Sequence, residues 1–384
     1  MSRPFDLPNE GLFVARIWSP QAGGPVIARL DGDLVVDITS PNAPTMQALL
    51  ETPNLAEMVQ AMDGQEICSL QAIADNAMEV PDGSKPYLLA PCDLQAVKAC
   101  GVTFVSSMLE RVIEEKAKGD PTKAEAIRVR CTEILGDSLR NVVPGSSKAD
   151  ELKEALIASD VWSQYLEVGI GKDAEVFSKA QPMSSVGSGA AVGLHPSSSW
   201  NNPEPEIVLA VTSKGIIVGA TLGNDVNLRD IEGRSALLLG KAKDNNAASS
   251  IGPFVRLFDE TFSLDDVRGA ELDLTVIGPE GYVLSGKSSM KEISRDPVDL
   301  VAQAMGRHHQ YPDGMFLYLG TLFAPTDDRD VPGEGFTHKI GDVVSIHTAN
   351  LGTLTNTVRL STEATPWTFG TSALMANLAQ RKLL

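Results

Sequence analysis

Cysteine, clustered basic residues and long apolar stretches are scarce in this chain of 384 residues, and each scarcity excludes a class of protein. The four cysteines show no CxxC spacing and fit no small secreted framework, so reduced thiols in a cytoplasm are predicted. No run of about 18 apolar residues is present to span a membrane. The N-terminal segment also lacks the apolar region of a signal peptide.

Basic residues form no run long enough to bind a polyanion, and the formal net charge of −18 makes the chain strongly acidic. A nucleic acid or an anionic membrane is therefore not expected as a partner. The segment GSGAAVG lacks the GxGxxG spacing of a dinucleotide site, so no redox cofactor is predicted. A hydrophobic content of 43% is typical of a soluble globular protein, and we expect a cytoplasmic one.

The succession of apolar runs and turns predicts an α+β fold with unequal parts. Residues 1–90 alternate short apolar runs with turn residues, which predicts a small β-rich domain, and 91–384 are expected to form the larger domain. Within it, 106–165 has helical spacing interrupted by KGDPT and VVPGSS. This pattern predicts a helical insertion with hinge-capable loops, able to act as a lid.

A pair of glutamates opens a strand-like run in EPEIVLAV, which with IIVGATLGNDV predicts a β-hairpin turning near Thr212–Gly215. Strand side chains alternate, so Glu204 and Glu206 point the same way. A register centred on the turn places Thr221–Gly223 opposite the glutamates, with Asp225 one step further out and diagonal to Glu204. Three converging carboxylates suit a hard cation such as Mg²⁺, Mn²⁺ or Ca²⁺. A solvated acidic strand end is the simpler alternative.

These segments resemble the metal-binding region of the fumarylacetoacetate hydrolase family, whose pattern is ExE, then an Asp, then an Arg-Asp pair. The pattern falls here on Glu204, Glu206, Asp225 and Arg229-Asp230. Further segments match in the right order: FSKAQPMSSVGSGAAV with Lys179, GKAKDNNAASSIGPFV with Lys243, YLGTLFAP with Thr321, and GDVVSIHTANLGTLTN with Thr353. The resemblance spans roughly Val97 to Val358.

The resemblance implies a mixed β-roll or sandwich core and a divalent cation on the three carboxylates, with Mg²⁺ expected first. It implies that Lys243 holds the keto oxygen or carboxylate of a small 2-keto acid, although a surface lysine is the alternative. A homodimer or homotetramer is also expected. The candidates for substrate binding are Ser106, Ser107, Arg111, Lys179, Arg229, Thr321 and Thr353. Three of these, the two arginines and Lys179, could instead be structural ion-pair partners.

One stretch departs from the hydrolases of the family, which carry a Tyr-x-x-His-x-x-Glu run whose His–Glu dyad activates water. In GVTFVSSMLERVIEE, Phe104 replaces the tyrosine, Ser107 takes the histidine position and Glu110 keeps the glutamate. Hydrolysis of a carbon–carbon bond is therefore disfavoured. Together with HHQYPDGMFLYLGTLFAPTDDRD, the stretch resembles the branch of sugar-acid dehydratases that convert 2-keto-3-deoxy-pentonates to 2-oxoglutarate semialdehyde.

The candidate catalytic residues are Glu110, Glu114 and Lys243. The two glutamates lie one helical turn apart and could serve as base and acid if their environments separate their pKa values. Ser107-x-x-Glu110 also matches a capping box, which needs no active site. Glu114 could likewise lie on a solvated helix face.

We therefore expect a Mg²⁺-dependent lyase that dehydrates 2-keto-3-deoxy-D-xylonate or 2-keto-3-deoxy-D-arabinonate in non-phosphorylative pentose catabolism. A cation chelating the carboxylate and the 2-keto oxygen would stabilise the enolate formed when a C3 proton leaves. One alternative is a metal-dependent hydrolase or decarboxylase of a β-diketo acid, which the serine at the histidine position disfavours. Another is a non-enzymatic metal-binding or sugar-acid-sensing protein, which the joint presence of the three catalytic candidates disfavours.

Overall fold

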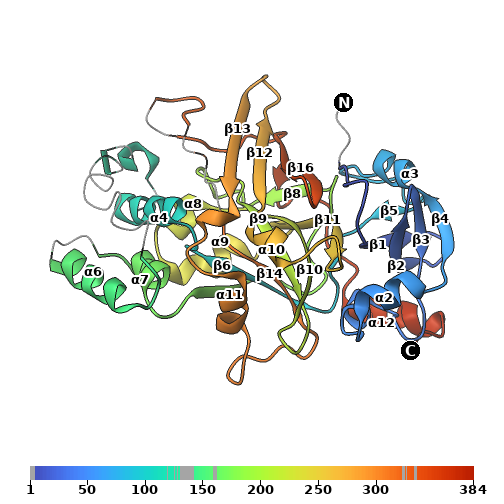
Figure 1. The fold of residues 1–384 in the computed structure, drawn as a ribbon. Helices are drawn as coiled ribbons and strands as arrows, with labels where there is room; N and C mark the ends of the chain where they lie inside the picture. Colours follow the sequence, from blue (N-terminus) through green and yellow to red (C-terminus); the bar gives the residue numbers. More distant parts are fainter. Residues whose placement is uncertain are drawn as a thin grey trace.

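The structure is a computed structural model, and a large mixed β-sheet forms its centre (Figure 1). It describes residues 5–384 except 119, 125, 128, 130–141, 159–161, 322–324, 326 and 333–334, and it leaves the side chains of 105–107 and 121 undescribed. Strands and helices alternate irregularly along the chain, so the class is the α+β class that the sequence predicts.

The larger sheet joins the N-terminal strands to the centre of the molecule in one path. Within the described residues the order is β4-β3-β2-β1-β11-β10-β9-β14-β6-β7, with β5 paired to β1. The strands are β1 Phe13–Ser19, β2 Gly24–Asp31, β3 Leu34–Asp37, β4 Gln65–Ser69, β5 Tyr87–Leu88, β6 Ala96–Gly101, β7 Glu175–Ala180, β9 Pro205–Val211, β10 Ile217–Asp225, β11 Ser249–Leu257 and β14 Met315–Tyr318.

A smaller sheet packs against the larger one and closes the apolar core. Its order is β13-β12-β15-β16-β8. Buried residues alternate with exposed or half-buried ones along β12, so one face of this sheet meets solvent. Leu209 and Leu222 of the larger sheet share a buried cluster with Val344 and Ile346 of the smaller one. The strands are β8 Ala191–Leu194, β12 Glu271–Ile277, β13 Val283–Ser289, β15 Val343–Thr348 and β16 Gly352–Leu360.

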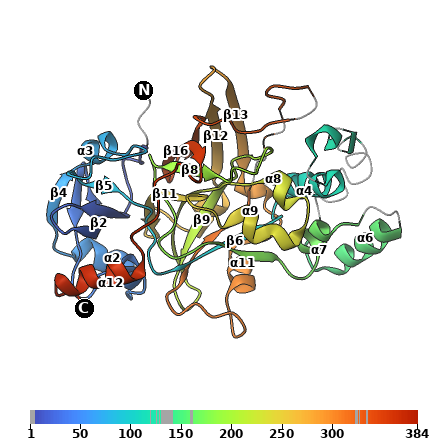
Figure 2. The same ribbon diagram turned by 180° about the vertical axis from the view of Figure 1, so that it is seen from behind.

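Helices gather at two opposite ends of the sheets, as both views show (Figures 1 and 2). Near the N-terminal strands lie α1 Met46–Leu50, α2 Leu55–Ala61, α3 Leu70–Asp75 and α12 Thr371–Gln380. The opposite end carries α4 Val105–Ala117, α6 Ser147–Ala158 and α7 Gln164–Ile170. The remaining helical segments are η1 Pro121–Lys123, α8 Arg229–Glu232, η3 Ala236–Leu238, α9 Leu239–Lys243, α10 Leu264–Arg268, η4 Met290–Glu292 and α11 Pro297–Ala304. Among the helices of the described chain, none has the length and apolar character needed to cross a membrane.

The predicted register of the central hairpin is wrong by two residues. Gly223 pairs with Glu206, and the N–H of Asp225 donates to the carbonyl of Glu204 at 3.0 Å. Part of the shift comes from the turn, which is closed by a hydrogen bond from the Thr212 N–H to the Ile216 carbonyl. The rest comes from an irregularity between Ile217 and Gly219. A shift of two keeps every side chain on its predicted face, so Asp225 lies opposite Glu204 instead of diagonal to it.

The N-terminal strands share their core with the rest of the chain. β1 pairs with β11 through Phe13–Arg256 and Val14–Val255. Phe254 of β11 is fully buried in a cluster with Phe13 and other N-terminal residues, and its ring centroid lies 6.2 Å from that of Phe5. The domain boundary near residue 90 stays a prediction, but the apolar contacts cross it.

Phe254→Ala is expected to lower the free energy of unfolding by about 3–5 kcal/mol, because it leaves a cavity where the two parts meet. Urea denaturation followed by tryptophan fluorescence would measure the loss. As a control, Val283→Ala removes atoms from a side chain that is 62% exposed, and we expect a change within about 0.5 kcal/mol. A loss of under about 1 kcal/mol for Phe254→Ala would contradict the shared core.

Candidate active site

The three carboxylates of the central hairpin lie together in the interior. One oxygen each from Glu204, Glu206 and Asp225 lies within 4.8 Å of the other two, and all three residues are buried. Glu204 directly precedes β9 and Asp225 ends β10, so the pairing of these strands sets their separation. Each supplies an oxygen ligand of the kind that hard cations prefer.

Cationic side chains from three other elements contact two of these carboxylates. The Lys243 Nζ atom of α9 lies 2.7 Å from Glu204 Oε2 and 3.2 Å from Asp225 Oδ1. Lys179 of β7 lies 2.8 Å from Asp225 Oδ1, and Arg111 of α4 donates to Glu204 Oε1. Burial favours protonated Asp225, yet the two ammonium groups hold its pKa below the ordinary value. Burial also opposes the charge of Lys243, but Asp225 and Glu204 raise the pKa of its ammonium group.

Glu206 differs from its two neighbours because it has no cationic partner among the described residues. Its Oε2 atom accepts a hydrogen bond of 2.7 Å from the Gly320 N–H. Burial, together with the charges of Asp225 and Glu204, raises the pKa of Glu206 well above its ordinary value. Gly320 has φ of +98°, and a Cβ atom there would lie 2.0 Å from Thr103 Oγ1, so only glycine fits.

A second layer of charges surrounds Arg111. Its Nη1 atom lies 2.7 Å from Glu114 Oε2 and 3.1 Å from Glu232 Oε2. Glu114 Oε1 lies 3.2 Å from the Nε of Arg229, whose guanidinium also lies over the Trp200 ring. Burial raises the pKa of Glu114, and Arg111 and Arg229 oppose that rise.

The charges of this site do not balance. In the described chain, ion pairs join four cationic side chains to four carboxylates. Two further carboxylates, Glu175 and Glu206, line the cavity and bring the number of carboxylates to six. With every group charged, two negative charges remain uncompensated. Buried charge is costly unless it is paired, and a divalent cation would compensate it. The cations are Arg111, Lys179, Arg229 and Lys243, and the carboxylates are Glu114, Glu175, Glu204, Glu206, Asp225 and Glu232.

The donor set therefore fits Mg²⁺ or a similar hard divalent cation. The three side chains that could bind the ion each offer a carboxylate oxygen. Among the described residues, the cluster contains no sulfur or imidazole ligand. Among the residues that the structure describes, Glu206 lacks a positive partner, as expected of a ligand whose counter-ion is a metal. Arg111 and Lys243 would have to share Glu204 with that ion.

A small cavity of about 10 Å³ adjoins the cluster, which is room for about one water molecule. Glu175 of β7 lines it and was missed by sequence reasoning. Burial, with the nearby charge of Glu232, raises the pKa of Glu175 to about 7. In the described chain the carboxyl group of Glu175 has no hydrogen-bond or ion-pair partner, and a Cβ atom on Gly101 would lie 2.0 Å from its Oε2. The alternation of Glu175, Phe177 and Lys179 in AEVFSKA is the signal that could have found it.

The structure brings most of the predicted residues together. The cavity lining or the ion pairs around it include Glu114, Lys243, Glu204, Glu206, Asp225, Arg111, Lys179, Arg229 and Thr321. Thr353 of β16 does not join them: its hydroxyl group contacts Asp6 and His347. Glu110 does not line the cavity, although its charge acts on Arg229. The side chains of Ser106 and Ser107 lie outside what the structure describes.

The capping box predicted for Ser107 and Glu110 is wrong. Helix α4 begins at Val105, and its N-cap residue is Phe104, which makes no side-chain cap hydrogen bond. Ser107 is therefore already the third helical residue, and Glu110 lies in the helix interior. The buried Phe104 bridges to Ile293, so strand-like pairing decides where the helix starts.

Residues 172–359 match the family described as fumarylacetoacetate (FAA) hydrolase, C-terminal. The match runs from β7 through β16 and contains the three clustered carboxylates with both lysines. This part of the chain belongs to the fumarylacetoacetate hydrolase family. Arg111 and Glu114 come from α4, which precedes the matched segment.

Two relatives share about a third of their aligned residues with this chain. A probable 2-keto-3-deoxyxylonate dehydratase of Haloferax volcanii is 33% identical over 200 residues, which cover 52% of this chain and 65% of the relative. The 2-dehydro-3-deoxy-D-arabinonate dehydratase of Saccharolobus solfataricus is 32% identical over 186 residues, covering 48% and 58%. The aligned part thus spans less than two thirds of either relative.

Solved structures show the same fold. A 2-keto-3-deoxy-D-arabinonate dehydratase complexed with magnesium and 2,5-dioxopentanoate aligns with a TM-score of 0.63 at 20% identity, covering 91% of this chain and 99% of that chain. A fumarylacetoacetate hydrolase of Exiguobacterium antarcticum aligns with a TM-score of 0.53 at 15% identity, again over 91% and 99%. The predicted α+β fold of this family is thereby confirmed.

Glu204→Gln is expected to weaken Mg²⁺ binding by at least about 100-fold, because it removes a charged ligand from a site that needs it. Calorimetric titration of metal-free protein with Mg²⁺ would measure the loss. Glu57→Gln, an exposed position on α2, is the matched control and should bind as the parent does. A Glu204→Gln protein with unchanged near-UV circular dichroism and parental affinity would refute the metal site.

Proposed function

We propose that this protein is a Mg²⁺-dependent dehydratase of a 2-keto-3-deoxy-pentonate, such as 2-keto-3-deoxy-D-xylonate or 2-keto-3-deoxy-D-arabinonate. The product would be 2-oxoglutarate semialdehyde, which is 2,5-dioxopentanoate. The observation that carries the proposal is the oxygen-only carboxylate cluster, in which Glu206 has no cationic partner among the described residues, beside a lysine and a titratable carboxyl group. The names of both sequence relatives and of the magnesium-bound structural relative support it.

Glu204, Glu206 and Asp225 would hold the divalent cation. When bound, the ion would supply Lewis-acid stabilisation of negative charge on the 2-keto oxygen as a C3 proton leaves. Lys243 keeps its charge next to this cluster. It is therefore placed to donate a hydrogen bond to the keto or carboxylate oxygen of the substrate, as the family resemblance predicts.

Glu175 is the best candidate for the base that removes the C3 proton. Its pKa of about 7 places it where a base is effective near neutral pH. Its carboxyl group lines the cavity and has no ionic partner in the described chain. Glu114 is less suited, because both of its oxygens are engaged by arginines. We therefore assign the acid–base role to Glu175 and the positioning of Arg111 and Arg229 to Glu114.

One carboxyl group is enough to move the proton in the dehydration step. Glu175 takes a proton from C3, and the electron pair left at C3 forms the C3–C4 double bond as the C4–O bond breaks. The proton on Glu175 passes to the departing hydroxyl group, which leaves as water. Loss of a C5 proton and reprotonation at C3 then give a C4–C5 enol. This enol becomes the aldehyde when C4 takes up a proton and the C5 hydroxyl group loses one, with no change of overall oxidation state and no redox cofactor.

A hydrolase or decarboxylase of a β-diketo acid is the alternative for the same metal site. Hydrolysis needs a residue that activates water, and the histidine position of the family's dyad carries Ser107. The dehydration of a sugar acid needs no such dyad. A metal-binding or sugar-acid-sensing protein would bind the same ligands but turn none of them over.

Incubation with 2-keto-3-deoxy-D-xylonate and Mg²⁺ is expected to form the semialdehyde, and removal of the metal with EDTA should abolish its formation. Coupled oxidation of the aldehyde by an added NAD-dependent dehydrogenase would measure it. Both pentonate epimers and acylpyruvate would be assayed in parallel. Turnover of acylpyruvate alone would favour the hydrolase, and binding without turnover of any acid would favour a sensor.

Glu175→Gln is expected to lower kcat by at least about 100-fold, the contribution of one general base. In the parent, kcat/KM should rise with pH through about pH 7, because Glu175 must be deprotonated to accept the C3 proton. Glu167→Gln, on the neighbouring helix α7 and exposed, is the control. Loss of activity with retention of the pH profile would assign the titration to another group.

Helix α4 is expected to move when substrate binds. A cavity of about 10 Å³ cannot hold a five-carbon acid, and Arg111 occupies an oxygen of Glu204. Hydrogen exchange of α4 and of the β9–β10 hairpin, with Mg²⁺ and with or without pyruvate, would report the change. Protection that rises in both segments supports a lid, whereas equal and strong protection in both states shows a static helix.

A further inference from the structure

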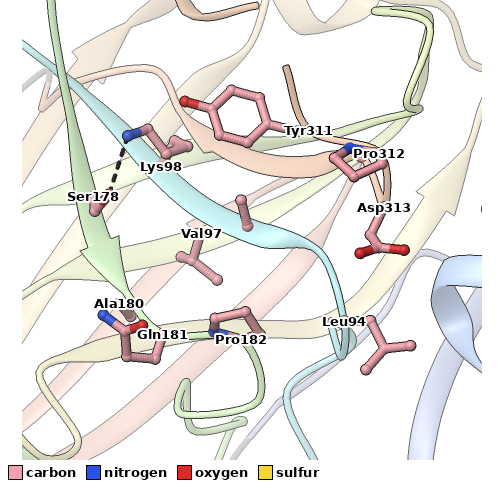
Figure 3. A pocket seen from close by; sticks show the side chains of 12 residues that line it. Leu94, Val97, Lys98, Ser178, Ala180, Gln181, Pro182, Tyr311, Pro312 and Asp313 are labelled. Carbon is pink, nitrogen blue, oxygen red and sulfur yellow. Dashed lines mark hydrogen bonds between the residues drawn. The ribbon is translucent and has the colours of Figure 1, made fainter. Parts of the chain in front are cut away.

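A second cavity, of about 290 Å³, lies between β6, β7 and the loop that precedes β14 (Figure 3). It shares no lining residue with the carboxylate cavity. β7 nevertheless serves both, because Phe177 lines the carboxylate cavity and the next residue, Ser178, lines the second one. This cavity has no part in the dehydration proposed above.

Lys98 supplies positive charge to this cavity without a counter-ion. The ammonium group lies 3.1 Å from Ser178 Oγ and 5.7 Å from the centroid of the Tyr311 ring. Within the described chain, no carboxylate lies within 4.0 Å of the Lys98 Nζ atom. Burial lowers the pKa of Lys98, and only the distant Cys100 thiol acts against that shift. In the described part of this chain of net charge −18, a half-buried cation thus has no carboxylate as counter-ion.

Two hydroxyl groups accompany the ammonium group. Ser178 Oγ contacts Lys98 directly. Figure 3 shows the hydroxyl group of Tyr311 directed toward the same end of the cavity as Lys98. One ammonium and two hydroxyl groups are a set of donors that matches the acceptor oxygens of one carboxylate.

The rest of the cavity is apolar and ends in a negative charge. Val97, Ala180 and Pro182 also line it, and they offer a surface for a short hydrocarbon chain. Asp313 lies at the end away from Lys98 (Figure 3). A second carboxylate on the ligand would meet this like charge, so a monocarboxylate is favoured over a dicarboxylate. Inorganic phosphate would leave the apolar surface uncovered.

We propose that this cavity is a second binding site, separate from the active site, for a small monocarboxylate with an apolar tail. Lys98 and Ser178 bind the carboxylate group, and the wall formed by Val97, Ala180 and Pro182 contacts the tail. The site selects a ligand that carries a negative charge at the Lys98 end of the cavity and no second negative charge at the Asp313 end.

Butyrate, with neutral butyramide as the matched ligand, tests the site. The lysines are reductively methylated with ¹³C-formaldehyde, and the Lys98 resonance is assigned by its absence from Lys98→Met. We expect saturable butyrate binding that raises the Lys98 pKa by about one unit, because an adjacent carboxylate favours the charged ammonium. Lys98→Met should reduce butyrate affinity at least about tenfold. Lys214→Met, which changes an exposed lysine outside this cavity, should leave the affinity unchanged.

The metal-site variant separates this site from the active site. Glu204→Gln should bind butyrate as the parent does, because the two cavities share no residue. An equal response to butyramide, a response to phosphate but not to butyrate, or no saturable response at Lys98 would overturn the proposal. Loss of binding in Glu204→Gln would place the butyrate in the active site and would also overturn it.

Discussion

Uncompensated negative charge in the interior is the constraint on which the site depends. A buried carboxylate without a partner either takes up a proton or destabilises the fold. This chain gathers its cations from separate elements: Arg111 from α4, Lys179 from β7, Arg229 from α8 and Lys243 from α9. Ion pairs thereby hold α4, β7 and α9 to the carboxylates of the central hairpin, and Arg229 of α8 is held to Glu114 of α4. The remaining excess is what prepares the cluster for a divalent ion.

The same arrangement gives neighbouring carboxyl groups different chemistry. Asp225 lies between two ammonium groups and stays charged, whereas Glu206 has a single backbone donor and favours the proton. In the part of the chain that the structure describes, the carboxyl group of Glu175 has neither kind of partner, and burial raises its pKa to about 7. Chemically similar side chains within one interior can therefore serve as ligand and as acid–base group, because their partners differ.

Much of the site could be predicted from the sequence because it depends on strand alternation. The alternation placed Glu204, Glu206 and Asp225 on one face, and an error of two in the register did not change that face. Glu175 and Glu232 were missed because they reach the cavity from β7 and α8, whose positions only the tertiary structure sets. The start of α4 and the position of Thr353 were predicted wrongly for the same reason. The bridge from Phe104 to Ile293 and the contact of Thr353 with Asp6 join residues far apart in the sequence, which local spacing cannot predict.

The pairing of β1 with β11 limits which N-terminal segments could replace the native one in a chimeric protein. Deleting the N-terminal strands would leave β11 with an open hydrogen-bonding edge and would expose Val255 and Phe254 to water. Such edges add strands from other molecules and cause aggregation. The N-terminal segment therefore cannot be exchanged as a cassette between relatives unless the incoming strand reproduces the apolar surface that β11 presents.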